Sequence, residues 1–128
     1  MIYLDTSVAL AHLLAEDRVP PPALWEAPLV TSRVLEYEVW TRVHARDLAR
    51  SHGDAARMLF ARLAFLELDR AVLYRALEPF PVTVRTLDAL HLASIAFLRE
   101  RGHDVLLATY DTRMRDAAVG MGVELFAL

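Results

Sequence analysis

The sequence contains no cysteine and no lysine, and each absence excludes several kinds of chemistry. Without cysteine the chain can form no disulfide, no zinc–thiolate site and no thiol nucleophile. All 14 basic residues are arginines, so mechanisms that depend on a lysine are excluded as well. Those mechanisms include P-loop nucleotide hydrolysis and Schiff-base catalysis.

Long hydrophobic runs are also missing. The apolar stretches are short and interrupted by charges, so we expect no membrane span. No basic segment precedes the first apolar run, so we expect no signal peptide and a cytoplasmic protein. The chain has 128 residues, of which 55% are hydrophobic and 24% charged, and this size and composition predict a single domain over residues 1–128.

Short apolar runs typical of buried strands alternate with helical patterns along the chain. The strand patterns cover residues 1–4, 28–31, 105–109 and 123–126. The helical patterns cover residues 7–16, 32–48, 54–65, 69–77, 86–101 and 111–119. Ser32 and Thr86 are expected to cap two of these helices, and Gly53 is expected to break the chain before the third. The alternation predicts an α/β fold, in which helices cover both faces of a mostly parallel sheet.

Acidic residues fall where the predicted strands end. Asp5 follows the first strand, and Asp111 follows the third. Glu36 and Glu38 lie in the first turns of the helix after the second strand, and Asp88 lies in the first turn of the fifth predicted helix. Because ligands of open α/β sheets bind beyond the carboxyl ends of the strands, we expect these acids to share one edge of the sheet.

Such a cluster has a specific chemical use. Carboxylates packed together repel one another, and a hard divalent cation such as Mg²⁺ or Mn²⁺ removes the conflict. The ion also activates a bound water and offsets the charge that develops on a phosphate. The acidic edge therefore predicts a metal-dependent phosphodiester hydrolase that needs no lysine, cysteine or histidine base.

Each acid also has an ordinary structural explanation. Asp5 and Asp111 could cap the helices that follow them, and Asp88 would be favoured by the dipole of its helix. Glu36 and Glu38 could be surface residues. The common placement of all these acids at one sheet edge favours the chemical role over these separate explanations.

Histidine and arginine residues near the acids give weaker signals. His91, one turn after Asp88, is expected to be a core or rim residue rather than a base. Arg42, Arg46 and Arg50 form a helical stripe that could contact RNA phosphates or simply face solvent. The net charge of −3 is mild evidence against a nucleic-acid partner, but acids bound to metal would leave a slightly positive balance.

Four segments of the chain together resemble a known family. They are the opening LDTS, the helix TSRVLEYEVWTR, the helix RTLDALHLASI and the turn LLATYDTRM. These segments resemble PIN-domain ribonucleases and, among them, the VapC toxins of bacterial toxin–antitoxin pairs. The resemblance spans nearly the whole chain and implies a PIN-like three-layer sandwich.

The resemblance also implies which residues form the site. The family's acids match Asp5, Asp88 and Asp111, and the family's spacing selects Glu38 as the second acid, with Glu36 as the fallback. These acids would be catalytic and would bind Mg²⁺ or Mn²⁺. Two hydroxyl residues match positions that orient the acids, and one further position is sometimes an extra acid. These second-sphere candidates are Thr6, Thr109 and Asp116.

Two functions remain in competition. The resemblance implies a Mg²⁺- or Mn²⁺-dependent endoribonuclease that acts as a toxin, with an RNA substrate, a cognate antitoxin that covers the acidic cleft, and a homodimeric state. The alternative is a PIN-fold binding or RNA-processing module without nuclease activity of its own. Phosphoryl transfer through an aspartyl-phosphate is disfavoured, because it needs a lysine and, in the phosphatases, an aspartate where Ser7 stands.

Overall fold

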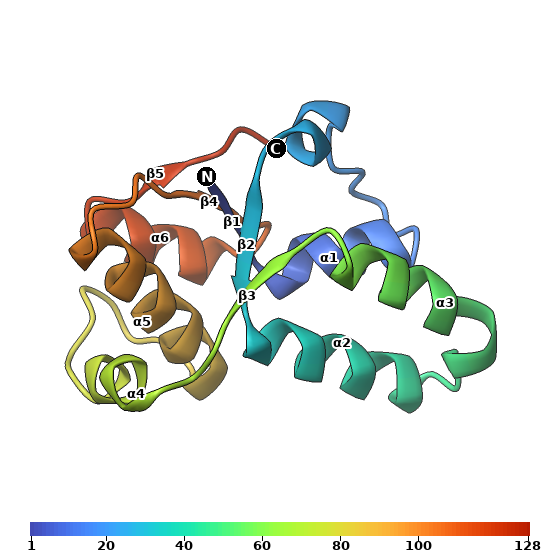
Figure 1. The fold of residues 1–128 in the computed structure, drawn as a ribbon, viewed down its shortest axis with the longest axis horizontal. Helices are drawn as coiled ribbons and strands as arrows, with labels where there is room; N and C mark the ends of the chain where they lie inside the picture. The colour runs from blue at the N-terminus through green and yellow to red at the C-terminus, as the bar shows by residue number, and fades with distance from the viewer.

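The computed structural model describes all 128 residues, and its strands form one parallel sheet (Figure 1). In chain order the strands are β1 (Ile2–Leu4), β2 (Leu29–Ser32), β3 (Ala64–Leu66), β4 (Leu106–Ala108) and β5 (Glu124–Leu125). Their order across the sheet is β3-β2-β1-β4-β5, and every neighbouring pair is parallel. β1 therefore lies at the centre, between β2 and β4.

Helices cover both faces of this sheet, as the sequence predicted. They are α1 (Thr6–Leu13), α2 (Arg33–Ala45), α3 (Ala49–Phe60), α4 (Arg70–Ala76), α5 (Thr86–Glu100) and α6 (Thr112–Gly120), with a short 3₁₀ helix at Pro22–Glu26. In Figure 1, α1, α2 and α3 lie on one side of the strands, and α4, α5 and α6 lie on the other. The predicted three-layer α/β arrangement is confirmed. No helix combines the length and apolar character that crossing a membrane would require.

Each face of the sheet carries its own hydrophobic core, because side chains alternate between the two faces along a strand. Ile2 and Leu4 of β1 pack into one cluster with residues of α1, α2 and α3. Tyr3, between them, packs into a second cluster with residues of α5 and α6. β1 is thus buried on both faces, which explains why its sequence is a continuous apolar run.

Several helices begin with a side chain that accepts a hydrogen bond from the backbone of the first turn. Ser32 caps α2 as predicted, and Asp5 and Asp111 cap α1 and α6 in the same way. The two acids therefore fill the structural role that their sequence positions allowed. Thr86 does not cap α5, because it is already the first helical residue, and Arg85 occupies the cap position.

The helix predicted over residues 54–65 is wrong at both ends. α3 begins at Ala49, so Gly53 lies inside the helix instead of breaking the chain. The helix ends at Phe60, and Ala64–Leu66 pairs with β2 as the edge strand β3. Periodicity alone cannot assign so short an apolar run to helix or strand, and the pairing with β2 decides it.

Replacing Gly53 with alanine is expected to stabilise the protein by about 0.5–1 kcal/mol, because glycine weakens a helix interior. The added Cβ would have Nη1 of Arg57 as its nearest neighbour, at 3.4 Å, and this flexible side chain can move. The matched control is Gly120→Ala at the end of α6, where the new Cβ would lie 2.5 Å from Cβ of Pro81.

The free energy of unfolding of the Gly120→Ala control should fall by about 1–3 kcal/mol, because the added methyl group overpacks this contact. Chemical denaturation of both variants measures the two changes. A Gly53→Ala protein that unfolds at lower denaturant concentration than the parent would contradict the placement of this glycine inside α3.

Candidate active site

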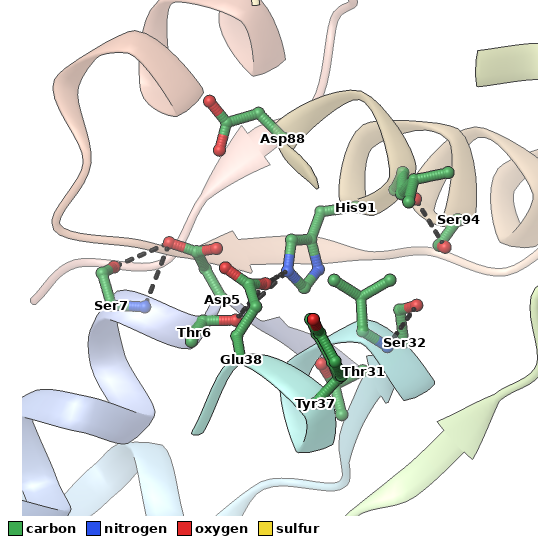
Figure 2. Close-up of polar contacts among 12 residues, drawn as sticks. Asp5, Thr6, Ser7, Thr31, Ser32, Tyr37, Glu38, Asp88, His91 and Ser94 are labelled. Atoms are coloured by element: carbon green, nitrogen blue, oxygen red, sulfur yellow. Dashed lines mark hydrogen bonds and ion pairs between the residues drawn. The ribbon is translucent and has the colours of Figure 1, made fainter. Parts of the chain in front are cut away.

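The carboxyl edge of the sheet brings together the acids that the sequence singled out. Asp5 follows β1 directly, and Asp111 begins α6 just beyond β4. Glu38 lies in the second turn of α2, which leaves β2, and Asp88 lies in the first turn of α5. Figure 2 shows Asp5, Glu38 and Asp88 projecting from three different elements into the same region.

Asp5 is almost completely buried, with 5% of its surface exposed, and its two oxygens differ in what they contact. Oδ2 accepts hydrogen bonds from the hydroxyls of Ser7 and Thr109, both at 2.7 Å, and from the backbone N–H of Ser7 at 3.4 Å. Oδ1 has no partner in the protein and is not fully buried. Thr109 also accepts a hydrogen bond from the backbone N–H of Asp111 at 3.0 Å, so it links the two acids.

Glu38 is held in the same asymmetric way. Its Oε1 accepts a hydrogen bond from the hydroxyl of Thr6 at 2.8 Å and lies 2.7 Å from Nε2 of His91, while Oε2 has no partner. His91 is buried, and its Nδ1 lies 2.7 Å from the hydroxyl of Tyr3. Burial raises the pKa of Tyr3 far above its ordinary value, so this hydroxyl keeps its proton.

Arg85 connects the remaining two acids. Its Nε donates to Oδ2 of Asp88 at 3.3 Å, and its Nη2 donates to Oδ2 of Asp111 at 3.1 Å. The hydrogen bond to Asp88, followed by the charges of both acids, raises the pKa of Arg85. Asp88 keeps Oδ1 without a partner, whereas Oδ1 of Asp111 accepts the backbone N–H of Met114 at 3.0 Å. Asp111 is therefore the one acid of the four with both oxygens engaged.

These side chains have the chemistry of a site for a hard divalent cation, although they do not converge on one point. Asp5, Glu38 and Asp88 each present an oxygen without a protein partner, and carboxylate oxygens are the ligands that Mg²⁺ and Mn²⁺ take. No three acidic or histidine side chains lie close enough together to hold an ion in this arrangement. Carboxylates repel one another, and the charge of Arg85 stands between two of the acids where a cation would otherwise compensate them.

The remaining predicted residues differ in their relation to the acids. Thr6 and Thr109 each donate a hydrogen bond to one of them. Glu36 instead pairs with Arg33 at 2.8 Å, away from the other acids, so the geometry favours Glu38 over this fallback. Asp116 on α6 is exposed and forms no side-chain hydrogen bond.

A surface pocket of about 620 Å³ lies beside the acids and contains the predicted arginines Arg42 and Arg46. Both are exposed, and neither forms an ion pair. Arg18, in the same pocket, donates to the carbonyl of Tyr110 at 2.9 Å, and its guanidinium lies 5.2 Å from the centre of the Tyr110 ring. Acidic side chains line the pocket as well, namely Glu16, Asp17 and Asp111.

Sequence reasoning did not assign Ser7 or Arg85 to the site, and it placed His91 in the core or rim without its contacts to the acids. Ser7 stands two residues after Asp5, a spacing at which a side chain commonly bonds its local neighbour, so a signal was present. Arg85 precedes Asp88 by three residues, which is the spacing of helical ion pairs and was also readable. The contacts of His91 are made with residues of three other elements, β1, α1 and α2, and no local sequence pattern predicts them.

A parallel α/β sandwich with an acidic site at the carboxyl edge of its sheet defines the class of this protein. A family model described as "PIN domain" matches residues 2–120. The chain therefore belongs to the PIN-domain family, as the resemblance of its sequence motifs implied.

Two curated relatives from Mycobacterium tuberculosis cover most of the chain. "Ribonuclease VapC46" (strain ATCC 25618 / H37Rv) is 36% identical, over 98% of this chain and 96% of the relative. "Ribonuclease VapC47" (strain CDC 1551 / Oshkosh) is 31% identical, over 89% of this chain and 87% of the relative. The family resemblance thus extends to relatives whose names describe them as ribonucleases.

Solved structures support the fold at lower sequence identity. A chain of a "Toxin-antitoxin complex from Klebsiella pneumoniae" superposes with a TM-score of 0.70 and 18% identity, over 94% of both chains. Mycobacterium tuberculosis VapC20, described as a "Sarcin-Ricin loop cleaving toxin", superposes with a TM-score of 0.66 and 21% identity, over 91% of this chain and 95% of that one. At these identities the similarity concerns the fold.

Proposed function

We propose that the protein is a metal-dependent endoribonuclease that acts as the toxin of a toxin–antitoxin pair and hydrolyses RNA phosphodiester bonds. The observation that carries this proposal is the free oxygen that each of Asp5, Glu38 and Asp88 presents at the carboxyl edge of the sheet. The relatives named Ribonuclease VapC and the fold shared with toxin structures support it. They also support an antitoxin partner, and we include a homodimeric state and a cytoplasmic location in the proposal.

Mg²⁺ or Mn²⁺ would be held by Asp5, Glu38 and Asp88, with Asp111 joining them when Arg85 releases it. The bound ion supplies a water of lowered pKa and a positive charge opposite the phosphate. The protein's contribution is to fix one oxygen of each acid so that the other faces the substrate. We assign this task to the hydroxyls of Thr6 and Thr109, which donate hydrogen bonds to Glu38 and Asp5.

Arg85 compensates two of the acids, and it would become available for substrate where a bound cation took over that charge. Its side chain is 65% exposed, so it can turn outward without leaving a cavity. A guanidinium suits a phosphate, because it can donate two parallel hydrogen bonds to the phosphate oxygens.

Arg42 and Arg46 are proposed to contact the RNA backbone beside the acids. Their charges are not paired with a carboxylate, so they remain available for phosphates. Arg18 is fixed by Tyr110 in the same pocket, and it places a rigid cation next to an aromatic ring beside the proposed RNA contacts. Asp116 is a weaker candidate for a further acid, since it lines a pocket with Arg85 and Asp111 but forms no side-chain hydrogen bond.

One observation favours the alternative function, a PIN-fold binding module without nuclease activity. The acids are too far apart to hold an ion in the arrangement described. A module of this kind would bind RNA or a partner protein but no divalent metal, so metal binding separates the two functions.

Asp5→Asn is expected to reduce RNA cleavage in Mn²⁺ or Mg²⁺ by at least about 100-fold, since loss of an outer partner alone costs roughly 10–100-fold at metal sites. The fold should persist, because asparagine caps a helix as well as aspartate does. Incubation of the antitoxin-free protein with total RNA, with metal or with EDTA, measures the change.

The matched control is Glu36→Gln, which alters an acid of α2 that pairs with Arg33 instead of joining the site. It should cleave like the parent protein. Cleavage that survives in Asp5→Asn or in EDTA would contradict the proposed chemistry, and loss of cleavage in Glu36→Gln would transfer the second-acid role to that residue.

Arg85→Ala is expected to bind Mn²⁺ more tightly than the parent, by up to about tenfold, because the ion no longer competes with the guanidinium for Asp88 and Asp111. The gain is limited, since exposed ion pairs are weak. Calorimetric titration with Mn²⁺ measures it, and Arg113→Ala, a neighbouring arginine without an ion pair, is the control. An unchanged or weaker Mn²⁺ affinity in Arg85→Ala would show that Arg85 does not compete with the ion.

The pair of substitutions Arg42→Ala and Arg46→Ala should weaken RNA binding and flatten its salt dependence. Each lost phosphate contact lowers the slope of log K against log salt by about 0.7 on single strands. Fluorescence anisotropy in the Asp5→Asn background, where the RNA stays intact, measures the slope. Arg101→Ala, at the C-cap of α5 and therefore at the opposite end of this helix from Asp88, is the control for loss of an arginine outside the pocket. If the double variant and the protein without these two substitutions show the same slope, Arg42 and Arg46 do not contact RNA phosphates.

A further inference from the structure

We propose that His91 is a positioning residue, which orients Glu38 through a hydrogen bond from Nε2 and so directs the free Glu38 oxygen toward the metal site. The inference rests on the proposed function and adds a residue to it. His91 does not itself touch the metal or the RNA. It acts through Glu38.

The contacts of His91 are complete and lie out of reach of solvent. The side chain is 1% exposed, and Nε2 lies 2.7 Å from Oε1 of Glu38. Nδ1 lies 2.7 Å from the hydroxyl of Tyr3, whose ring stands nearly perpendicular to the imidazole at 83°. Both ring nitrogens therefore have a partner, and two elements, β1 and α2, fix the ring from opposite ends.

The chemistry of the partners decides which nitrogen carries the proton toward Glu38. An ionised carboxylate can only accept hydrogen bonds, so Nε2 must donate. The hydroxyl of Thr6 lies 3.2 Å from Nε2, but its own proton goes to the same Glu38 oxygen. The Tyr3 hydroxyl can donate to Nδ1 when that nitrogen is unprotonated, which leaves the proton on Nε2.

Glu38 needs this support more than the other acids do. Asp5 is held by Ser7 of its own turn and by Thr109, which directly follows β4, and it has a short side chain. Glu38 has a longer and more flexible side chain, and it comes from α2, whereas Asp88 comes from α5. The bond between His91 and Glu38 is the one side-chain hydrogen bond that joins α2 to α5. It therefore sets where Glu38 stands relative to the acid contributed by α5.

Both donors contact the same oxygen of Glu38, so the two oxygens have different roles. Oε1 accepts from both Thr6 and His91, so its lone pairs are occupied within the protein. Oε2 is left as the only oxygen that can serve an ion. Without His91 the Glu38 carboxylate can rotate and exchange its two oxygens. The fixed orientation of Oε2 toward the metal site is then lost.

The test is a double-mutant cycle between His91 and Glu38, read by Mn²⁺ affinity and by kcat and KM separately. His91→Leu should weaken Mn²⁺ binding by about 10–100-fold, as expected for an outer partner of a metal ligand. In the Glu38→Gln background the same substitution should change the affinity by less than about twofold, because the group through which it acts is altered. His91→Gln, which can place an amide N–H near the position of Nε2, should recover part of the loss.

Two further variants separate positioning from folding. Ile95→Ala removes packing from the same helix without touching Glu38, so it should lower the melting temperature and leave Mn²⁺ affinity unchanged. Tyr3→Phe removes only the hydroxyl that contacts Nδ1. It should also weaken Mn²⁺ binding, but by a smaller factor than His91→Leu. This second variant keeps the test decisive if His91→Leu does not fold.

The outcomes also distinguish this inference from the proposed function. A parent protein that binds no Mn²⁺ and cleaves no RNA overturns both. A parent protein that binds Mn²⁺, with equal affinity in folded His91→Leu, overturns the role of His91 alone. A loss of the same size with and without the Glu38 carboxylate would make His91 a purely structural residue, and this too overturns the inference.

Discussion

The repulsion between carboxylates gathered at one edge of a sheet is the constraint on which the rest of this site depends. The parallel topology brings the acids that follow β1, β2 and β4, and one from α5, to that edge. Carboxylates so placed repel one another unless hydrogen-bond donors or positive charge compensate them. The protein uses both means. Hydroxyls and an imidazole hold Asp5 and Glu38, and the guanidinium of Arg85 holds Asp88 and Asp111.

Structural and chemical roles coexist in the same side chain, because the two oxygens of a carboxylate can do different things. Asp5 caps α1 and accepts two hydroxyl hydrogen bonds through Oδ2 alone, and its Oδ1 stays open. Glu38 and Asp88 repeat the pattern with one held oxygen and one free oxygen. Asp111 departs from it, since the cap of α6 and Arg85 occupy both of its oxygens. A helix-capping role therefore does not count against metal binding at Asp5.

The parts of the fold and site that follow from short-range patterns could be predicted from the sequence. Apolar runs, caps and helical spacing gave the α/β alternation and located the acids at strand ends. Gly53 and the strand Ala64–Leu66 were misassigned, because a helix can hold a buried glycine and because pairing with β2 creates the edge strand. The hydrogen bonds of His91 could not be predicted, since its partners Tyr3 and Glu38 lie far from it in the sequence, at separations of 88 and 53 residues. Such contacts are set by packing of the layers.

The two ways of holding the acids have different consequences for the proposed chemistry. Thr6 and His91 hold Oε1 of Glu38 as hydrogen-bond donors and leave Oε2 without a partner, so a cation could bind there while they stay in place. Arg85 holds Asp88 and Asp111 by opposite charge from an exposed position, and a cation that binds there takes over the charge that Arg85 supplied. Glu38 is thus positioned by hydrogen bonds that a cation would leave in place, whereas Asp88 and Asp111 are compensated by a charge that a cation would replace.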